Sequence, residues 1–563
     1  MYKKIFETDI QNYLNKNSLK FKTVIDYSDY EDYQYQSPIL FNLKKQKNFK
    51  LDDFILFLQS TQNYEKIEST GPGFLSVKFN LINSVPVPIH SPQKIVVDYC
   101  GVNIAKQMHI GHIRSMFIGD FIVRAHKDDE VIIYNHIGDW GNQFGFLLQY
   151  IKDNNLPVED NKKLTEYYKS SYQLYLTDPT FKKKADECAY ALHSKNSEIV
   201  SLWQKCVKTS LKEVQDVFNL FDLKINISDT QGESFYADMC PFIEKELINS
   251  GIAQPQNDGS VVSFFKDKSP LILKKSTGSY LYAMYDLAAI KWRNDNINPD
   301  KIIYVVDKRQ SLHFEQVFEI ANQMKWAKPN SLFHIGFGTI LGKDKKPLKT
   351  KSGDALYLDD LLAEGRDQLL ASEHFTKIEN DYKEEILGKT VVGALKYYDL
   401  KFNKQQDYIF DWEFVLNTKG NSAPYLQNAY VRIDSIFYNK FGTNLTSFSR
   451  LSIDELSPIG KDLFFNCQKM QEIISDLTQN EYQSQSVSQQ MMKISQLFHS
   501  LYEKEKILNS EKENNNLSLL NEVTQTLEKS SEILGIPLYS CKQKMQDKKK
   551  VFSLFRLNYL TIT

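Results

Sequence analysis

The chain has 563 residues, of which 42% are hydrophobic and 25% are charged, and its formal net charge is −1. This length and composition predict several globular domains, and the lack of a basic excess restricts any nucleic-acid surface to a local patch. Six scattered cysteines argue against a disulfide framework or a structural zinc, and the absence of a secretory signal or of a roughly 18-residue apolar run predicts a cytoplasmic protein without a membrane segment.

The first part of the chain, residues 1–88, predicts a small α+β domain. The apolar residues within 5–14 have the spacing of a helix, whereas residues 41–43 and 75–79 alternate in polarity like half-buried strands. The proline-rich stretch 85–92 then predicts a linker to the next domain.

The stretch after this linker predicts a strand, a loop and a helix. Residues 95–97 are a continuous apolar run, and helical spacing begins near Met108. His109 and His112 then lie about one turn apart at a helix N-terminus, where free backbone N–H groups attract anions. Gly111 lets a planar ring approach the backbone. The combination suits a nucleotide with its phosphates, and the alternatives are an accidental surface pair or half of a metal site.

A second apolar strand at residues 131–134 follows this helix, and a third is predicted at 302–306. A strand, a helix and a strand at this spacing predict a parallel sheet, whose ligand lies outside the carboxyl ends of the strands. Residues from about 150 to 230 are charged and helical in spacing, which predicts a solvated helical insertion between the strands.

A tyrosine and an aspartate mark the next helix. Residues 271–282 predict a hairpin that leads into a helix at 283–293, and Tyr282 and Asp286 share one face at its start. An acid near a helix N-terminus often serves only to complement the helix dipole. The functional alternative is recognition of a guanidinium, whose planar donors pair bidentately with a carboxylate.

The chain is predicted to become helical after residue 408. Aromatic, amide and arginine side chains are interleaved there, at Tyr425, Gln427, Tyr430 and Arg432. Such side chains can stack on unpaired bases and hydrogen-bond them. The two tyrosines fit a hydrophobic core equally well.

Three motifs resemble the active-site core of class I arginyl-tRNA synthetases. They are Asn-Ile-Ala-Lys at 103–106, His-Ile-Gly-His-Ile-Arg-Ser at 109–115 and Asn-His-Ile-Gly-Asp-Trp-Gly-Asn-Gln-Phe-Gly at 135–145. The resemblance implies a multidomain α/β fold. Its parts are an N-terminal tRNA-contacting α+β domain at 1–88, a Rossmann-like parallel-sheet catalytic domain at 89–412 with the helical insertion, and an all-α anticodon-binding bundle with an atypical tail at 413–563.

The resemblance also implies roles for individual residues. Lys106 stands where many arginine enzymes carry a lysine that compensates for a degenerate Lys-Met-Ser-Lys loop, and the lysine-rich turn with Lys349 and Lys351 stands in place of that loop. A solvated turn is the ordinary alternative for such a stretch. The catalytic set implied is His109, His112, Lys106 and Lys349 or Lys351; the ATP site adds Gly111 and His313; the arginine site comprises Asp98, Asn103, Glu233, Tyr282, Asp286 and Gln310; and Tyr425, Gln427, Tyr430 and Arg432 contact tRNA.

The reaction that the resemblance implies ligates L-arginine to tRNA(Arg) in two steps. The arginine carboxylate attacks the α-phosphate of Mg-ATP and expels pyrophosphate, and the 2′-hydroxyl of the terminal tRNA adenosine then attacks the arginyl-adenylate. The implied partners are L-arginine, ATP with Mg²⁺ and tRNA(Arg), with no tightly bound cofactor and no metal held by the protein. The family also implies a monomer whose first step depends on bound tRNA.

The chain departs from the family pattern in three places. Cys100-Gly101-Val102 replaces the usual Ser-Ser-Pro, residues 480–492 are rich in glutamine and serine, and the tail at 542–563 has no counterpart in the family. These departures leave two alternatives, a paralogue that passes activated arginine to another acceptor and a catalytically silent tRNA-binding protein. The set of His109, His112, Lys106, Tyr282 and Asp286 is complete, which argues against a catalytically silent protein. A protein that only binds tRNA does not need these residues.

Overall fold

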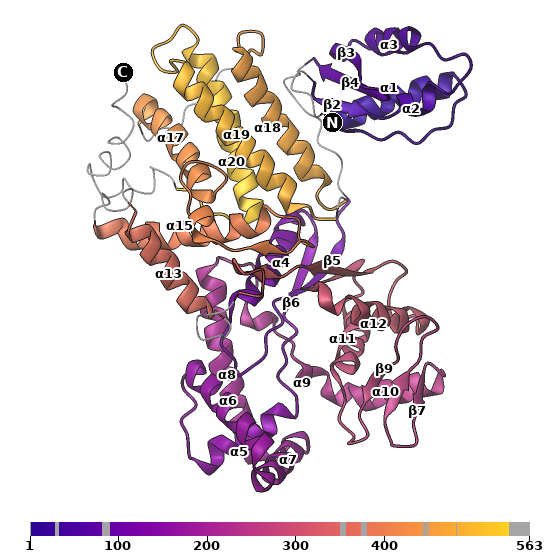
Figure 1. Ribbon diagram of the computed structural model, residues 1–563, viewed down its shortest axis with the longest axis vertical. Helices are drawn as coiled ribbons and strands as arrows, with labels where there is room; N and C mark the ends of the chain where they lie inside the picture. Colours follow the sequence, from indigo (N-terminus) through magenta and orange to yellow (C-terminus); the bar gives the residue numbers. More distant parts are fainter. Residues whose placement is uncertain are drawn as a thin grey trace. The chain divides into compact units, whose positions relative to one another are not determined.

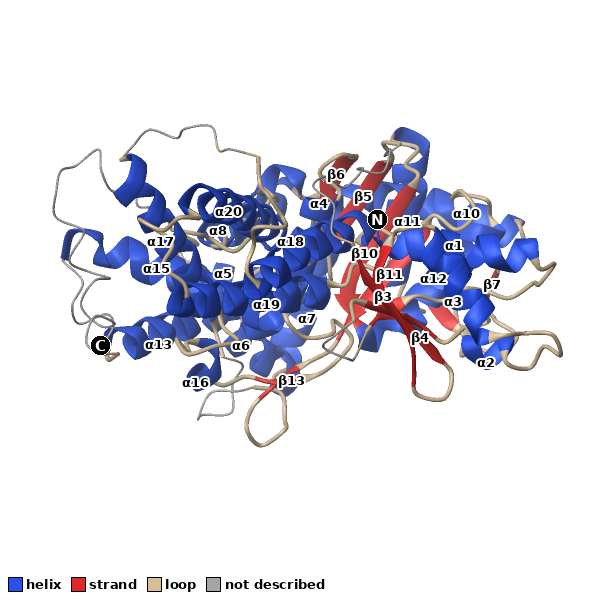
Figure 2. Cartoon of the chain, turned by 90° about the horizontal axis from the view of Figure 1, so that it is seen from above, coloured by secondary structure: helices blue, strands red, loops and turns tan. Residues whose placement is uncertain are grey.

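A four-stranded parallel sheet with strand order β11-β10-β5-β6 organises the middle of the chain (Figure 2). The computed structural model describes residues 2–28, 33–80, 91–348, 356–372, 380–442, 448, 450–479 and 481–539. Val97 pairs in parallel with Ile133 on one side and with Ile303 on the other. The predicted parallel sheet is therefore confirmed. Its strands are β5 (Lys94–Tyr99), β6 (Glu130–Tyr134), β10 (Lys301–Asp307) and β11 (Leu332–Phe337).

The burial of each strand follows its place in this sheet. The apolar residues of β5 and β10 are buried, since each strand has a neighbour on both sides. Residues 131–134 of β6, predicted as a buried strand, are only half-buried. The reason is that β6 lies at the edge of the sheet, which the local sequence does not reveal.

Helices connect the strands. A 3-10 turn, η1 (Ile110–His112), leads into α4 (Ile113–Ala125), so the helix begins later than the predicted start near Met108. The helices α11 (Tyr282–Asn296) and α12 (Ser311–Gln323) share one hydrophobic core with β5 and β10. Leu287, Val317 and Ile302 belong to this core and are fully buried.

The helical insertion predicted for residues 150–230 is confirmed (Figure 1). Each of its last three helices starts at a polar cap that accepts backbone N–H groups: Asp160, Asp178 and Asn196. Pro179 occupies the first turn of its helix, where no N–H is needed. The helices are α5 (Gln143–Asp153), α6 (Asn161–Thr177), α7 (Pro179–His193) and α8 (Ser197–Leu220).

A small antiparallel sheet follows the insertion and leads into α11. Its strands pair in the order β7-β8-β9, and an isolated bridge between Lys274 and Tyr280 closes the predicted hairpin before α11. The elements are η2 (Ile227–Asp229), α9 (Glu233–Tyr236), η3 (Ala237–Met239), α10 (Cys240–Asn249), β7 (Ala253–Pro255), β8 (Val261–Ser263) and β9 (Leu271–Lys274), and η4 (Lys308–Gln310) follows β10.

The N-terminal segment folds as the predicted α+β module, with an antiparallel sheet in the order β1-β2-β4-β3. One local prediction is wrong: residues 41–43 are helical, because Leu40 and Leu43 are buried with helical spacing and Phe41 is exposed. Three residues are too few to distinguish the two periodicities. The elements are α1 (Tyr2–Lys16), β1 (Asp26–Tyr27), β2 (Tyr35–Ser37), α2 (Leu40–Leu43), α3 (Leu51–Ser60), β3 (Tyr64–Thr70) and β4 (Phe74–Phe79).

The C-terminal part is almost entirely helical, as predicted. Within its described residues, one short parallel pair of strands, β12 (Ile340–Leu341) and β13 (Tyr408–Ile409), joins it to the end of the sheet region. No helix in the described parts of the chain has the length and apolar character needed to span a bilayer. The helices are α13 (Leu358–Leu370), α15 (Asn380–Leu400), α16 (Trp412–Val415), α17 (Ala423–Phe441), α18 (Pro458–Asp476), α19 (Ser484–Lys504) and α20 (Glu513–Leu534).

The chain divides into two compact units that do not follow sequence order. The first unit combines Met1–Ile89 with Thr446–Ser475 and Ser500–Val523, and the second contains the remainder. Within the first unit, Tyr2 donates a hydrogen bond to Gln468 of α18 over 2.7 Å, and its ring packs near Phe465. The N-terminal module thus shares its core with helices from near the other end of the sequence.

Candidate active site

The predicted residues Asn103, Lys106 and His109 lie on the loop that leaves the carboxyl end of the parallel strand β5. The loops after β5 and β6 are joined, since the N–H of Gly138 donates to the carbonyl of Val102 over 3.0 Å. A Cβ at Gly138 would lie 2.5 Å from the side-chain oxygen of Asn103, so only glycine permits this approach. Asn103 itself is exposed at this edge of the sheet.

His109 and His112 form a compact pair on the 3-10 turn η1. Their ring centroids are 4.0 Å apart, and His109 is the N-cap of the turn. The N–H of Gly111 donates to Nδ1 of His109 over 3.1 Å, and the N–H of His109 donates to Nδ1 of His112 over 3.0 Å. A backbone N–H can only donate, so both Nδ1 atoms accept in the tautomer that carries the ring protons on Nε2; Nδ1 of His112 also lies 3.2 Å from the carbonyl of His109.

The surroundings keep both imidazoles neutral at physiological pH. Burial and the neighbouring His109 lower the pKa of His112 to about 3, and burial together with Lys106 lowers the pKa of His109. The pair therefore offers two neutral N–H donors, which can hydrogen-bond phosphoryl oxygens without a change of protonation state.

The segment just after the lysine-rich loop is hydrogen-bonded to both sides of His109. The N–H of Ile110 donates to the carbonyl of Leu356 over 2.9 Å, and the N–H of Leu358 donates to that of Met108 over 3.1 Å. Lys349 and Lys351 lie outside the described residues. Residues 356–358, which follow these lysines in the sequence, are thus hydrogen-bonded to the segment that carries His109.

Tyr282, Asp286 and His313 form a second group, from α11 and α12. Nε2 of His313 lies 2.6 Å from a carboxylate oxygen of Asp286, and the rings of His313 and Tyr282 are 4.7 Å apart. Burial alone would raise the pKa of Asp286, but the hydrogen bond and positive charge from His313 bring it below its ordinary value. His313, predicted for the ATP site, thus contacts two residues predicted for the arginine site.

Glu233 stands at the start of α9, on a loop bound to the β6 loop. Its N–H donates to the carbonyl of Ile137 over 3.1 Å, and Ser234 donates through N–H and Oγ to the carboxylate of Asp139, over 2.9 and 2.6 Å. Burial, with the charges of Asp139 and Asp286, raises the pKa of Glu233 to about 8. Sequence reasoning missed Asp139, although it lies inside a quoted motif.

Asp98 was predicted to bind arginine, and in the structure it forms a buried ion pair within the protein. A guanidinium nitrogen of Arg293 lies 2.6 Å from its carboxylate, and both side chains are buried. The guanidinium also packs over the ring of Tyr134, 4.8 Å from the centroid. Sequence reasoning missed Arg293, which lies in a polar stretch at the end of the predicted helix, so that no local signal marked it as buried.

The remaining predicted residues lie at different places. Gln310 is exposed at the N-terminus of α12, next to the sheet edge. The predicted tRNA contacts all lie on α17. Gln427 and Tyr430 are buried, donating to the carbonyl of Pro537 and the carboxylate of Glu528, while Tyr425 and Arg432 are half-buried and contact His499. A role for these four side chains in tRNA binding stays a prediction.

Known proteins of one family match this chain along most of its length. The family model "tRNA synthetases class I (R), catalytic domain" matches residues 79–412, and the "DALR anticodon binding domain" matches residues 426–540. The arginine–tRNA ligase of Psychromonas ingrahamii is 33% identical over 566 residues, which cover 94% of this chain and 96% of the relative. The chain belongs to the arginyl-tRNA synthetase family.

A further relative and two solved structures are also similar to this chain. The arginine–tRNA ligase of Wigglesworthia glossinidia brevipalpis is 32% identical over 95% of this chain and 99% of its own. The arginyl-tRNA synthetase of Plasmodium falciparum superimposes with a TM-score of 0.79 at 27% identity, covering 95% of this chain and 98% of its own. That of Thermus thermophilus, at 17% identity, shows the same fold with a TM-score of 0.77 over 96% of this chain and 100% of its own.

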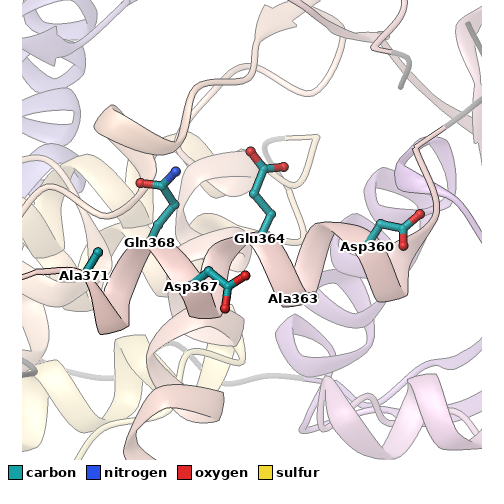
Figure 3. A pocket seen from close by; sticks show the side chains of 6 residues that line it. All are labelled: Asp360, Ala363, Glu364, Asp367, Gln368 and Ala371. Atoms are coloured by element: carbon teal, nitrogen blue, oxygen red, sulfur yellow. The ribbon is translucent and has the colours of Figure 1, made fainter. Parts of the chain in front are cut away.

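One surface depression of the protein is not suited to a nucleotide. The depression is lined by residues of α13 and by Ala371 directly after it (Figure 3). It is one face of a single helix, and Asp360, Glu364 and Asp367 make it acidic. An acidic helix face repels phosphates, so this depression is no nucleotide site.

Proposed function

We propose that this chain is an arginine–tRNA ligase that joins L-arginine to tRNA(Arg) for protein synthesis. The observation that carries the proposal is that two kinds of binding group lie at one edge of the sheet. A pair of neutral histidine donors, suited to phosphates, shares this edge with the carboxylates of Glu233, Asp139 and Asp286, suited to a guanidinium. Arginine and a nucleoside triphosphate are the two substrates that need this combination.

In the first step, the guanidinium of the substrate pairs with Asp286 and Glu233, and Tyr282 packs beside it. Asn103 and Gln310, exposed at the same edge, bind the polar main-chain part of the amino acid. The carboxylate of arginine is thereby aimed at the α-phosphate of ATP. Positioning of two reactants in this way supplies much of the rate enhancement without a covalent protein intermediate.

The leaving pyrophosphate requires positive charge and hydrogen-bond donors. His109 and His112 donate through Nε2 to the phosphoryl oxygens as charge develops. Lys106 lies exposed on the same loop and, with Lys349 or Lys351, offsets the charge of the pyrophosphate. Mg²⁺ would enter with ATP as part of the substrate and would offset part of the phosphate charge.

His313 and Asp98 act within the protein in this scheme. His313 holds the carboxylate of Asp286 in place while its ring lines the ATP side, and Asp98, paired with Arg293, supports the floor of the arginine pocket from β5. These two assignments refine the sequence-based prediction, in which Asp98 contacts arginine directly.

The second step requires tRNA to reach this edge. We assign tRNA contact to the N-terminal domain at 1–88 and anticodon binding to the helical part at 413–563, with Tyr425, Gln427, Tyr430 and Arg432 at or beneath the binding surface. The catalytic domain at 89–412 carries the chemistry. The protein acts as a cytoplasmic monomer in this proposal.

The experiment is charging of tRNA from the same organism with radiolabelled arginine. Wild-type protein charges tRNA(Arg), and His112→Ala lowers kcat by about 10²–10³-fold, the cost of losing one preorganised donor. Arginine-dependent ATP–pyrophosphate exchange without transfer to tRNA would point to a different acceptor. A folded protein that neither exchanges nor charges would refute the proposal in favour of a silent tRNA binder.

A further inference from the structure

The loop between β5 and η1 has a backbone that needs external support. It carries Asn103 and Lys106 and ends at His109, and Ala105 within it has a φ of 60°. This left-handed conformation is costly for any residue with a Cβ, and it persists only where the surroundings hold it.

The helical insertion supplies that support through buried hydroxyl groups. Oγ of Ser210, on α8, accepts the N–H of Ala105 over 3.0 Å, and Oγ1 of Thr165, on α6, accepts the N–H of Gln107 over 2.9 Å. Ser210 is 2% exposed and Thr165 is 7% exposed, so water cannot replace either bond cheaply.

These hydroxyls belong to one connected network. Ser210 donates to the side-chain oxygen of Asn161 over 2.7 Å, and Thr165 donates to the backbone carbonyl of Asn161 over 3.0 Å. The amide nitrogen of Asn161 donates to Glu213 over 2.9 Å and approaches the carbonyl of Lys106 at 3.4 Å. Each hydroxyl thus has its donor and its acceptor role fixed, which orients it toward the loop.

The same helix also contacts the side chain of the loop lysine. Nζ of Lys106 lies 4.6 Å from the centroid of the Tyr168 ring, and Tyr168 follows Thr165 by one turn of α6. A cation over an aromatic ring is held electrostatically. The helical insertion therefore contacts both the backbone of the loop and the charged group of Lys106.

We propose that Thr165 and Ser210, with Asn161 and Glu213 behind them, are positioning residues that set the loop of Lys106 and His109 for the activation of arginine. They touch no substrate and act through the backbone of residues 105–108. The inference rests on the proposed ligase function, and it gives the helical insertion a part in the first chemical step.

The test compares isosteric loss and retention of a single hydroxyl. Thr165→Val removes the acceptor and keeps the shape, whereas Thr165→Ser keeps the acceptor. In arginine-dependent ATP–pyrophosphate exchange with tRNA present, Thr165→Val and Ser210→Ala lower kcat about tenfold or more, because small misplacement of catalytic groups is costly. The KM for arginine stays within about twofold in both, and Thr165→Ser retains near wild-type kcat.

The matched control is Ser171→Ala, which removes a buried hydroxyl of α6 that donates, among the residues that the structure describes, to the backbone of its own helix at Tyr168. It leaves kcat unchanged. In a Lys106→Ala background, Ser210→Ala has a much smaller effect than in wild type, because both changes act on one loop.

Three results would overturn the inference while the wild-type protein is active. They are unchanged kcat in Thr165→Val and Ser210→Ala, equal losses in Thr165→Val and Thr165→Ser, or full additivity with Lys106→Ala. A wild-type protein without exchange activity would instead remove the proposed function, and this inference with it.

Discussion

Glu233 and Asp286 are two carboxylates whose surroundings shift their pKa values in opposite directions. Burial and two neighbouring acids raise the pKa of Glu233 to about 8, whereas the bond to His313 lowers that of Asp286. At pH 7 the first is mainly protonated and the second is ionised. Glu233 thus stays neutral until a cation binds beside it, whereas the ionised Asp286 attracts the cation.

Arginine binding is therefore expected to release a proton. A guanidinium beside Glu233 favours the carboxylate, so at pH 7 binding releases up to roughly one proton, and the affinity for arginine rises as the pH approaches the pKa of about 8. Calorimetry in two buffers of different ionisation enthalpy measures this release. Glu233→Gln abolishes it, whereas Glu244→Gln, on α10 and paired with Lys274, retains it. Equal release by wild type and Glu233→Gln would contradict the assignment.

At the scale of elements, one ion pair joins α11 to the central strand β5. Arg293 and Asp98 are both buried, and the tyrosines 134 and 304 enclose the guanidinium. The charge pair therefore fixes β5 against the helix that also carries Tyr282 and Asp286. A buried ion pair of this kind adds little to the free energy of unfolding. Loss of one partner, however, leaves the other as an unpaired charge that water does not solvate.

Arg293→Met is expected to destabilise the second unit by about 3–5 kcal/mol. All five tryptophans lie in that unit, at positions 140, 203, 292, 326 and 412, so their fluorescence during urea unfolding reports on it selectively. The control is Arg309→Met, because Arg309 pairs with Asp307 over 2.7 Å while 74% exposed. That change costs at most about 1 kcal/mol, since water screens the pair. Similar costs for both variants would contradict the role of burial.

At the scale of the whole molecule, catalysis and tRNA binding have different electrostatic needs. The chain has 69 basic and 70 acidic residues, so no overall field attracts a polyanion. Binding of tRNA must depend on local basic patches that contact phosphates directly. Each such contact releases counterions, which makes the affinity sensitive to salt even in a neutral protein.

Salt is therefore expected to weaken tRNA binding without weakening arginine binding comparably. Even two phosphate contacts give a log–log slope of about −1.8, or roughly a tenfold loss of affinity between 50 and 200 mM salt. Filter binding of tRNA(Arg) across this range measures the slope, and arginine affinity over the same range is the control. A slope near zero would contradict phosphate-dominated contact.

The sequence by itself determined the elements whose signal is local. Apolar runs at 95–97 and 302–306 are strands, the charged stretch after residue 150 is helical, and Tyr282 and Asp286 share the start of α11. The short motifs around His109 and residues 135–145 sufficed for the family, because chemistry at a nucleotide site requires particular residues close together in sequence. Residues 41–43 were misassigned where the local signal was too short.

Only the tertiary structure decided which distant groups meet. Asp286 pairs with His313, Asp98 with Arg293, and the loop at 105–108 rests on Thr165 and Ser210. It also placed β6 at the edge of the sheet and joined the N-terminal module to α18 within one compact unit. The physical reason is that periodicity and turn chemistry act over a few residues, whereas these contacts follow from strand order and from packing between segments up to hundreds of residues apart.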